Sequence, residues 1–235
     1  MNSLSIFKKG VQAGIPIALG YFAVSFSFGM ICVTNGLSVF DAVLISLTNL
    51  TSAGQFAGLK IIVSSGTYLE ILLSQLIINL RYSLMSFSLS QKLDNKHSFL
   101  YRYLIAFGVT DEIFAVSINQ DNKLNPYFNL GCMAIAIPGW TLGTLFGSLL
   151  GNVLPSIVTS ALSVSLYGMF IAIIIPPSKK DKNILYAIIC AMLLSSLMYY
   201  LPFINISSGF SIIIVTLLVS FLFAYLKPIK EEEYE

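Results

Sequence analysis

Charged side chains are scarce in this sequence, since aspartate, glutamate, lysine and arginine make up only 10% of its 235 residues. A soluble globular domain carries about a quarter charged residues and needs them to cover its surface. This chain, which is 56% hydrophobic, cannot cover itself in that way. Apolar stretches of about twenty residues recur along most of its length, and such stretches are typical of transmembrane helices. The composition therefore predicts an all-α polytopic membrane protein.

Residues that hold metals or form disulfides are also scarce. The only histidine, His97, lies in a charged loop, and the three cysteines are far apart within apolar runs. Such cysteines are typical of small buried hydrophobic residues rather than of a disulfide or metal site. The sequence has no Walker motif, and its net charge of +2 is too small to indicate a nucleic-acid partner. We therefore expect no metal, no cofactor, no nucleic acid and no ATP-driven pump.

Turn-forming residues divide the chain into eight apolar segments. The expected segments are 11–34, 41–62, 66–90, 99–119, 126–152, 157–176, 184–202 and 207–227. The basic residues test the topology, because lysine and arginine accumulate on the cytoplasmic side. Ten of the thirteen form four clusters: Lys8 and Lys9; Lys92, Lys96 and Arg102; Lys179, Lys180 and Lys182; and Lys227 and Lys230. Three segments separate the first cluster from the second, and three more separate the second from the third, so one segment in each triplet must fail to cross.

The second and sixth segments are the candidates. Residues 46–58, SLTNLTSAGQFAG, are too rich in hydroxyl, amide and glycine groups for a helix that faces lipid, and the sixth segment is hydroxyl-rich in its first half. If both are broken or re-entrant, about six segments cross and both termini are cytoplasmic. The halves 1–120 and 121–235 are then two inverted repeats, a plan that secondary transporters often use. The alternative is seven or eight ordinary crossings with one basic cluster on the other side.

A permanently charged side chain lies within the third segment. Arg81 is about nine residues, or about 13 Å, from the cytoplasmic end of a hydrocarbon core about 30 Å thick. The fourth segment returns with Asp111 and Glu112, which point about 100° apart on a helix. We expect one acid to pair with Arg81 and the other to serve a different task, because ionisable groups at this depth pair or line a cavity. The structural alternative is an ion pair that only holds the two segments together.

Other polar groups accumulate at a similar depth. Asn79 lies two residues before Arg81, and the broken second segment contributes hydroxyl, glycine and amide groups. A broken helix exposes N–H groups and the positive end of its dipole, and both attract anions. Together they suit a carboxylate, and the acid that Arg81 leaves unpaired is available to exchange a proton. The predicted substrate-binding residues are Ser52, Gly54, Gln55, Asn79, Arg81, Asp111 and Glu112.

Three further features of the sequence predict structural or interfacial roles. Gly143, Gly147 and Gly151 follow a four-residue spacing, which gives one helix face a bare strip for close packing. Trp140 is expected to be an interfacial anchor near the external end of its segment. Glu70, at the beginning of the third segment, is expected to be a solvated acid near the external interface, with a proton entry point as the alternative.

The sequence resembles the AzlC family over most of its length up to about residue 176. The resemblance rests on an ordered set of motifs: GIPIALGYFAVSFSFGMICVTNGLS, LTSAGQFAG, NLRYSLMSFSL, VTDEIFAV and WTLGTLFGSLLGNVLP. The family's Asn-Leu-Arg falls on residues 79–81, its Asp-Glu pair on residues 111 and 112, and its Gln-Phe on residues 55 and 56. A histidine often follows the family's arginine, and this chain has Tyr82 there. Ala53 and Gly54 directly precede the Gln-Phe, and the polar residues Thr51 and Ser52 come before them.

The resemblance implies an exporter of branched-chain amino acids in the bacterial cytoplasmic membrane, which works with a small hydrophobic subunit of the AzlD type. Leucine, isoleucine and valine are the expected substrates, and proton antiport through a buried acid is the expected coupling. The chain is not expected to be an enzyme, because no Ser–His, Cys–His or metal cluster accompanies the acids. A channel, an exporter of other small apolar solutes and an intramembrane enzyme stay open as alternatives.

Overall fold

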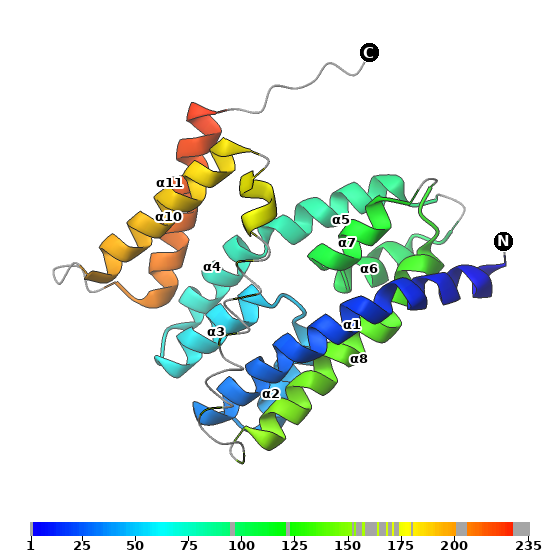
Figure 1. Ribbon diagram of the computed structural model, residues 1–235, viewed down its shortest axis with the longest axis horizontal. Helices are drawn as coiled ribbons and strands as arrows, with labels where there is room; N and C mark the ends of the chain where they lie inside the picture. Colours follow the sequence, from blue (N-terminus) through cyan, green and yellow to red (C-terminus); the bar gives the residue numbers. More distant parts are fainter. Residues whose placement is uncertain are drawn as a thin grey trace. The chain divides into compact units, whose positions relative to one another are not determined.

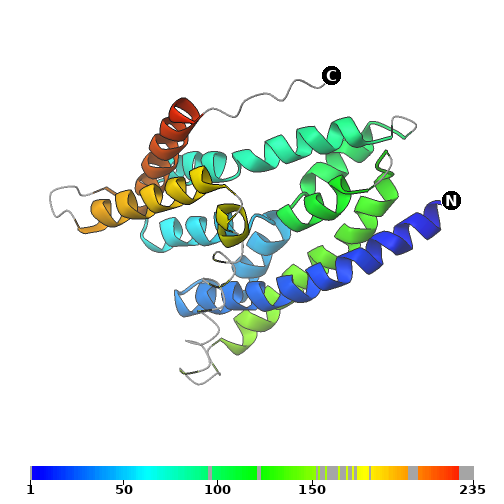
Figure 2. The ribbon, with the colours of Figure 1, turned by 45° about the horizontal axis from the view of Figure 1, so that its top comes forward.

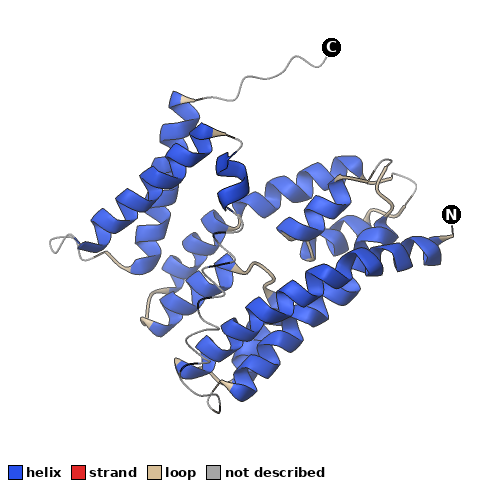
Figure 3. Cartoon of the chain, in the orientation of Figure 1, coloured by secondary structure: helices blue, strands red, loops and turns tan. Residues whose placement is uncertain are grey.

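The computed structural model describes residues 2–94, 97–120, 123–151, 174–179, 181–200 and 206–227, with isolated positions between 153 and 171. Over these residues the chain is helical, without a strand and with one isolated bridge between Leu93 and Leu124 (Figure 3). Four of the described helices are long and apolar enough to cross a membrane, and three shorter helices are apolar as well. The chain is therefore an all-α polytopic membrane protein, as its composition predicts.

The helix bounds locate the segments on the chain (Figure 1). The helices are α1 (Ser3–Thr34), α2 (Val39–Thr48), α3 (Ala53–Val63), α4 (Tyr68–Ile78), α5 (Leu80–Lys92), α6 (Leu100–Phe107), α7 (Asp111–Ile118), α8 (Pro126–Leu150), α10 (Lys182–Tyr200) and α11 (Ser208–Leu226). The predicted sixth segment, 157–176, lies almost entirely outside the described residues, as do Lys96, Lys180 and Lys230.

The predicted second segment is broken, as its polar composition suggests. α2 ends at Thr48 and α3 begins at Ala53, and residues 49–52 between them are not helical. Ser52 has a φ of 45°, in the left-handed region that residues other than glycine rarely adopt. A right-handed helix cannot continue through this residue, so the break between α2 and α3 is confirmed.

The third and fourth segments were predicted as continuous helices, and both are interrupted. α4 ends at Ile78 and α5 begins at Leu80, with Asn79 between them at φ −93° and ψ 3°. α6 ends at Phe107, and extended Thr110 (φ −133°, ψ 168°) precedes α7. The prediction of continuous helices was wrong because apolar residues stand on both sides of each break and conceal it. As a result, Arg81 lies in the first turn of α5, and Asp111 and Glu112 lie in the first turn of α7, instead of at helix centres.

By the density of its internal contacts the chain forms two compact units. The first unit contains residues 1–56 and 79–166, and the second contains residues 57–78 and 167–235. α1, α2, α5, α6, α7 and α8 belong to the first unit, and α4, α10 and α11 belong to the second. These units do not test internal symmetry, so the repeat boundary near residue 120 stays a prediction.

Within the first unit, α1 and α8 lie side by side along their lengths (Figures 1 and 2). A Cβ added to Gly143 would collide with the Phe22 carbonyl of α1, and one added to Gly147 would collide with the Phe26 carbonyl. A Cβ on Gly151 would lie 3.0 Å from Met30 Cγ. The glycine strip of α8 therefore receives the backbone of α1, and its packing partner belongs to this chain.

Trp140 lies on α8 among these glycines and is only 3% exposed. Its ring meets the ring of Tyr21 of α1 edge-on, with centroids 5.3 Å apart and planes at 83°. The expectation of an interfacial anchor is wrong for this tryptophan. An anchor must reach the lipid boundary, whereas this side chain is buried against α1.

In the second unit, α11 packs against α4 and α10. Glu70 of α4 is only 3% exposed, and its Oε1 accepts a hydrogen bond from the Ser207 hydroxyl and another, of 3.0 Å, from the Gly209 N–H at the beginning of α11. The expectation of a solvated interfacial acid is therefore wrong. The carboxylate instead satisfies donors at a helix N-terminus, where the dipole also favours a negative charge.

Candidate functional site

The break between α6 and α7 presents two acids. Thr110 is the N-cap of α7, and its Oγ1 accepts a hydrogen bond of 3.3 Å from the Ile113 N–H. Asp111 and Glu112 follow directly and occupy the first turn, where the helix dipole favours carboxylates. Because they are adjacent on a helix, their side chains leave it in different directions. The Thr110 cap thus holds two carboxylates in the first turn of α7, and their side chains point in different directions.

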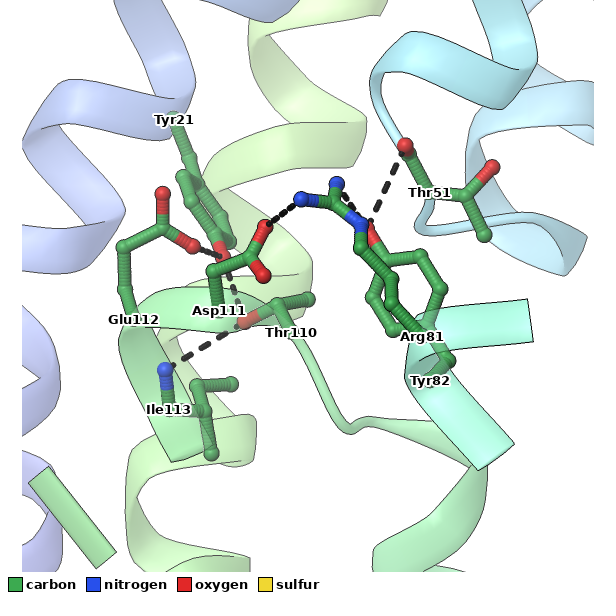
Figure 4. A network of polar contacts seen from close by, with 8 residues as sticks. All are labelled: Tyr21, Thr51, Arg81, Tyr82, Thr110, Asp111, Glu112 and Ile113. Atoms are coloured by element: carbon green, nitrogen blue, oxygen red, sulfur yellow. Dashed lines mark hydrogen bonds and ion pairs between the residues drawn. The ribbon is translucent and has the colours of Figure 1, made fainter. Parts of the chain in front are cut away.

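Arg81 pairs with the first of these acids. Its Nη1 lies 2.9 Å from Asp111 Oδ2, and the two side chains are 39% and 34% exposed (Figure 4). The pair joins the first turn of α5 to the first turn of α7. The sequence predicted that one of the two acids pairs with Arg81, and the structure assigns this contact to Asp111.

Glu112 instead meets Tyr21 of α1. The phenolic oxygen lies 2.5 Å from Glu112 Oε2 and 2.5 Å from Thr110 Oγ1 (Figure 4). A phenol has one proton to donate and can also accept. When Glu112 is ionised, Tyr21 donates to it and accepts from Thr110; when Glu112 is protonated, the carboxylic acid donates to Tyr21 and Tyr21 donates to Thr110. The donors and acceptors of this arrangement can therefore be paired in either protonation state of Glu112.

Tyr82 connects the arginine to the broken second segment. Arg81 Nη2 donates to the Tyr82 hydroxyl at 3.2 Å, and this hydroxyl donates to the Thr51 carbonyl at 3.3 Å. The guanidinium also lies over the Tyr82 ring, 5.0 Å from its centroid, at a distance typical of a cation–π contact. The break thus reaches Arg81 through Tyr82 and a carbonyl group. The Gly54 N–H donates to that same Thr51 carbonyl at 3.2 Å, within the start of α3.

Gln55 belongs to a neighbouring network of hydroxyl groups. It is 2% exposed, and its Nε2 donates to Ser46 Oγ at 3.1 Å. Ser46 Oγ lies 2.7 Å from Thr144 Oγ1, which donates to the Trp140 carbonyl at 3.2 Å. Because Thr144 uses its only proton there, Ser46 donates to Thr144 and accepts from Gln55. The chain of hydrogen bonds runs in one direction, from α3 through α2 to α8.

The structure therefore brings together part of the predicted set. Arg81, Asp111 and Glu112 meet within one polar network, which Tyr82 links to the break that precedes α3 (Figure 4). Asn79 lies at the N-cap position of α5 without a side-chain cap hydrogen bond. No group of three or more histidine, cysteine, aspartate or glutamate residues suited to a metal occurs within the part of the chain that the structure describes.

Sequence reasoning missed three members of this network: Tyr21, Tyr82 and Thr110. The local signal for Thr110 was present, because a glycine followed by threonine and two acids is typical of one helix ending and a capped helix beginning. Tyr21 carries no such signal, whereas Tyr82 stands where a histidine often follows the family's arginine. An aromatic residue in an apolar helix reads equally well as a packing residue, and only the fold shows which polar groups its hydroxyl meets.

Together, the fold and this network define a class: an all-α polytopic membrane protein with an arginine–aspartate pair and a second acid beside it. A family model described as "AzlC protein" matches residues 16–154, which is more than half of the chain. This chain belongs to the AzlC family. The matched residues include the whole network from Tyr21 to Glu112 and the glycine strip of α8.

Individual relatives agree with this membership. An uncharacterised membrane protein of Archaeoglobus fulgidus is 35% identical over 76% of this chain and 80% of its own length. The inner membrane protein YgaZ of Escherichia coli is 22% identical over 76% of each chain, and an uncharacterised membrane protein of Helicobacter pylori is 25% identical over 81% of this chain and 86% of its own. No solved structure matches the chain. The family and these relatives indicate a membrane-transport role.

Proposed function

We propose that this chain exports leucine, isoleucine and valine across the cytoplasmic membrane as a secondary transporter. The observation that carries the proposal is the arginine–aspartate pair with a second, separately held acid beside it. Ionisable groups are costly within a membrane, and those that occur there usually mark a pathway for a solute or an ion. The branched-chain substrate is what the resemblance to the AzlC family implies.

The Arg81–Asp111 pair offers complementary charges to a zwitterionic amino acid. The substrate carboxylate competes with Asp111 for the guanidinium, and the substrate ammonium group competes with Arg81 for the carboxylate of Asp111. An exchange of this kind replaces one ion pair by two, which limits the cost of separating the charges in a poorly solvated site. Asn79 and the start of α3, with Ser52, Gly54 and Gln55, complete the proposed substrate site.

Glu112 is the proposed proton carrier. Its bond to Tyr21 accommodates the ionised and the protonated carboxyl group, so a proton is gained or lost without loss of the contact to α1. Proton antiport then supplies the energy for export against a gradient. Alternating access follows from movement of the two predicted repeats against each other.

The assembly and orientation are part of the same proposal. The chain works with a small hydrophobic membrane subunit of the AzlD type, as the family resemblance implies. Both termini face the cytoplasm, because this orientation keeps all four basic clusters inside. The small subunit and the orientation are independent of the amino-acid site and are testable separately.

The experiment measures efflux of leucine, isoleucine and valine from cells loaded with a leucine-containing dipeptide. The chain is expressed in three forms: with the small AzlD-type subunit, without it, and as the Arg81→Ala variant with the subunit. The expected result is faster efflux with the intact pair and background efflux with Arg81→Ala. Arg102→Ala is the matched control, because this arginine bonds to Ser90 and lies over Phe99 outside the network. Normal efflux by a well-inserted Arg81→Ala protein contradicts the proposed site, and unchanged efflux by the intact pair points to other apolar solutes, a channel or an enzyme.

A further inference from the structure

Trp140 carries a buried donor that the proposed site does not use. Its Nε1 has no hydrogen-bond partner among the residues that the structure describes, and the side chain is 3% exposed. An indole N–H only donates, and burying it without an acceptor removes its hydration without compensation. Buried polar groups in native proteins normally have a partner. An acceptor from outside the described chain compensates for this loss.

The position of Trp140 connects the two polar networks of the first unit. Its ring packs edge-on against the ring of Tyr21, whose hydroxyl bonds to Glu112. Its backbone carbonyl receives the Thr144 hydroxyl, which continues through Ser46 to Gln55. Trp140 therefore adjoins the arginine and acid network on one side and the network of hydroxyl groups on the other.

A second unsatisfied group lies at the far end of the network of hydroxyl groups. Gln55 Oε1 is buried and has no partner among the described residues, whereas Gln55 Nε2 is engaged by Ser46. An amide oxygen only accepts. Among the buried atoms of the first unit that lack a partner in the described residues, Trp140 Nε1 is the one that can only donate, and Gln55 Oε1 is one of several that can accept, with Asn129 Oδ1 and Thr141 Oγ1. A buried donor suits the carboxylate of a zwitterion, and a buried acceptor suits its ammonium group.

We propose that Trp140 is a substrate-contacting residue whose indole N–H donates a hydrogen bond to the carboxylate of the transported amino acid. The inference rests on the proposed function, since it names a further contact of the same substrate. The carboxylate is the group selected because the ammonium end of an amino acid offers no acceptor to a donor-only indole. A carboxylate has two oxygens and accepts from several donors, so contacts to Arg81 and Trp140 are compatible in number.

The chain contains a single tryptophan, which makes the inference directly measurable. The intact complex with its small subunit is titrated with leucine, valine and isopentylamine, and the tryptophan emission is recorded. Subtracting the emission of the Trp140→Phe complex isolates Trp140 from any tryptophan of the subunit. Leucine and valine are expected to change this emission saturably. Isopentylamine, which lacks the carboxylate, is expected to leave it unchanged.

Transport kinetics in proteoliposomes provide the second reading. Trp140→Phe keeps an aromatic ring but removes the N–H, and we expect it to raise the KM for leucine roughly tenfold, the loss expected for a hydrogen bond to a charged acceptor. Phe146→Leu is the control, because Phe146 lies on the same helix and is 45% exposed. Its KM is expected to remain that of the wild type.

The outcomes separate this inference from the proposed function. Three results overturn the role of Trp140 without contradicting the transporter function. These are leucine transport without an emission change, an equal emission change with isopentylamine, and an unchanged KM in Trp140→Phe. If Trp140→Phe inserts poorly, the emission titration of the wild-type complex with the three ligands still decides. Absence of both leucine binding and leucine transport in the wild-type complex overturns the proposed function together with this inference.

Discussion

Two buried or half-buried acidic sites, one in each unit, are held in different ways. Asp111 and Glu112 of the first unit each contact a side chain of another helix. Asp111 contacts the guanidinium of Arg81, and Glu112 contacts the phenol of Tyr21. Glu70 of the second unit accepts from a hydroxyl and a backbone N–H at the beginning of α11. Both sites are acids at helix N-termini in an apolar chain. The difference in partners agrees with the proposed exchange at the first site and with helix docking at the second.

The largest expected effect comes from reversing the ion pair of the first unit. Arg81→Glu leaves two acids facing each other and is expected to abolish efflux and reduce the amount of inserted protein. Adding Asp111→Arg restores an oppositely charged pair, so we expect insertion to recover while efflux stays at background, because the guanidinium now belongs to α7. Membrane-fraction immunoblots and leucine efflux measure the two properties in the same cells.

The structural alternative predicts a different result for this double variant. If the pair only holds α5 against α7, its orientation is immaterial and efflux recovers together with insertion. Recovery of efflux would therefore show that Arg81 and Asp111 contact each other without contacting the substrate.

A smaller effect is expected at Glu70. Glu70→Ala removes the acceptor of two hydrogen bonds, each worth about 1.5–3 kcal/mol when one partner is charged, so the second unit should lose roughly 3 kcal/mol or more. Glu70→Gln keeps an amide oxygen for Ser207 and Gly209 and should lose less. Thermal unfolding of the purified complex measures the difference. Equal losses in the two variants would show that the charge of Glu70, and not its two hydrogen bonds, docks α11.

Composition and the length of the apolar stretches predicted the class of fold, because a chain with so few charged residues cannot cover itself with polar surface. The break before α3 was predictable as well, since hydroxyl and amide groups are concentrated in residues 46–58. The breaks at Asn79 and at residues 108–110 were not predicted, although Gly108 and Thr110 are ordinary helix-ending and helix-capping residues. These short signals were not used, because each lies within a long apolar run that was assigned to a single helix.

The candidate site was predictable to a similar extent. Arg81, Asp111 and Glu112 lie in apolar segments with few other charged residues to pair with. An ion pair among them could therefore be predicted from the sequence. The contacts of Tyr21, Glu70 and Trp140 did not follow, because each depends on a residue far away in the sequence. Trp140 and Glu70 were both expected near an interface, and both are buried by packing against another helix.

Leucine efflux under an imposed pH gradient tests the contrast between the two acids most directly. The complex is reconstituted as wild type, Glu112→Gln and Glu70→Gln, and efflux is compared with and without the gradient at equal amounts of folded protein. The account predicts that the gradient accelerates efflux in the wild type and in Glu70→Gln, while Glu112→Gln exchanges leucine without responding to the gradient. A full response in Glu112→Gln, or a response lost only in Glu70→Gln, would contradict it.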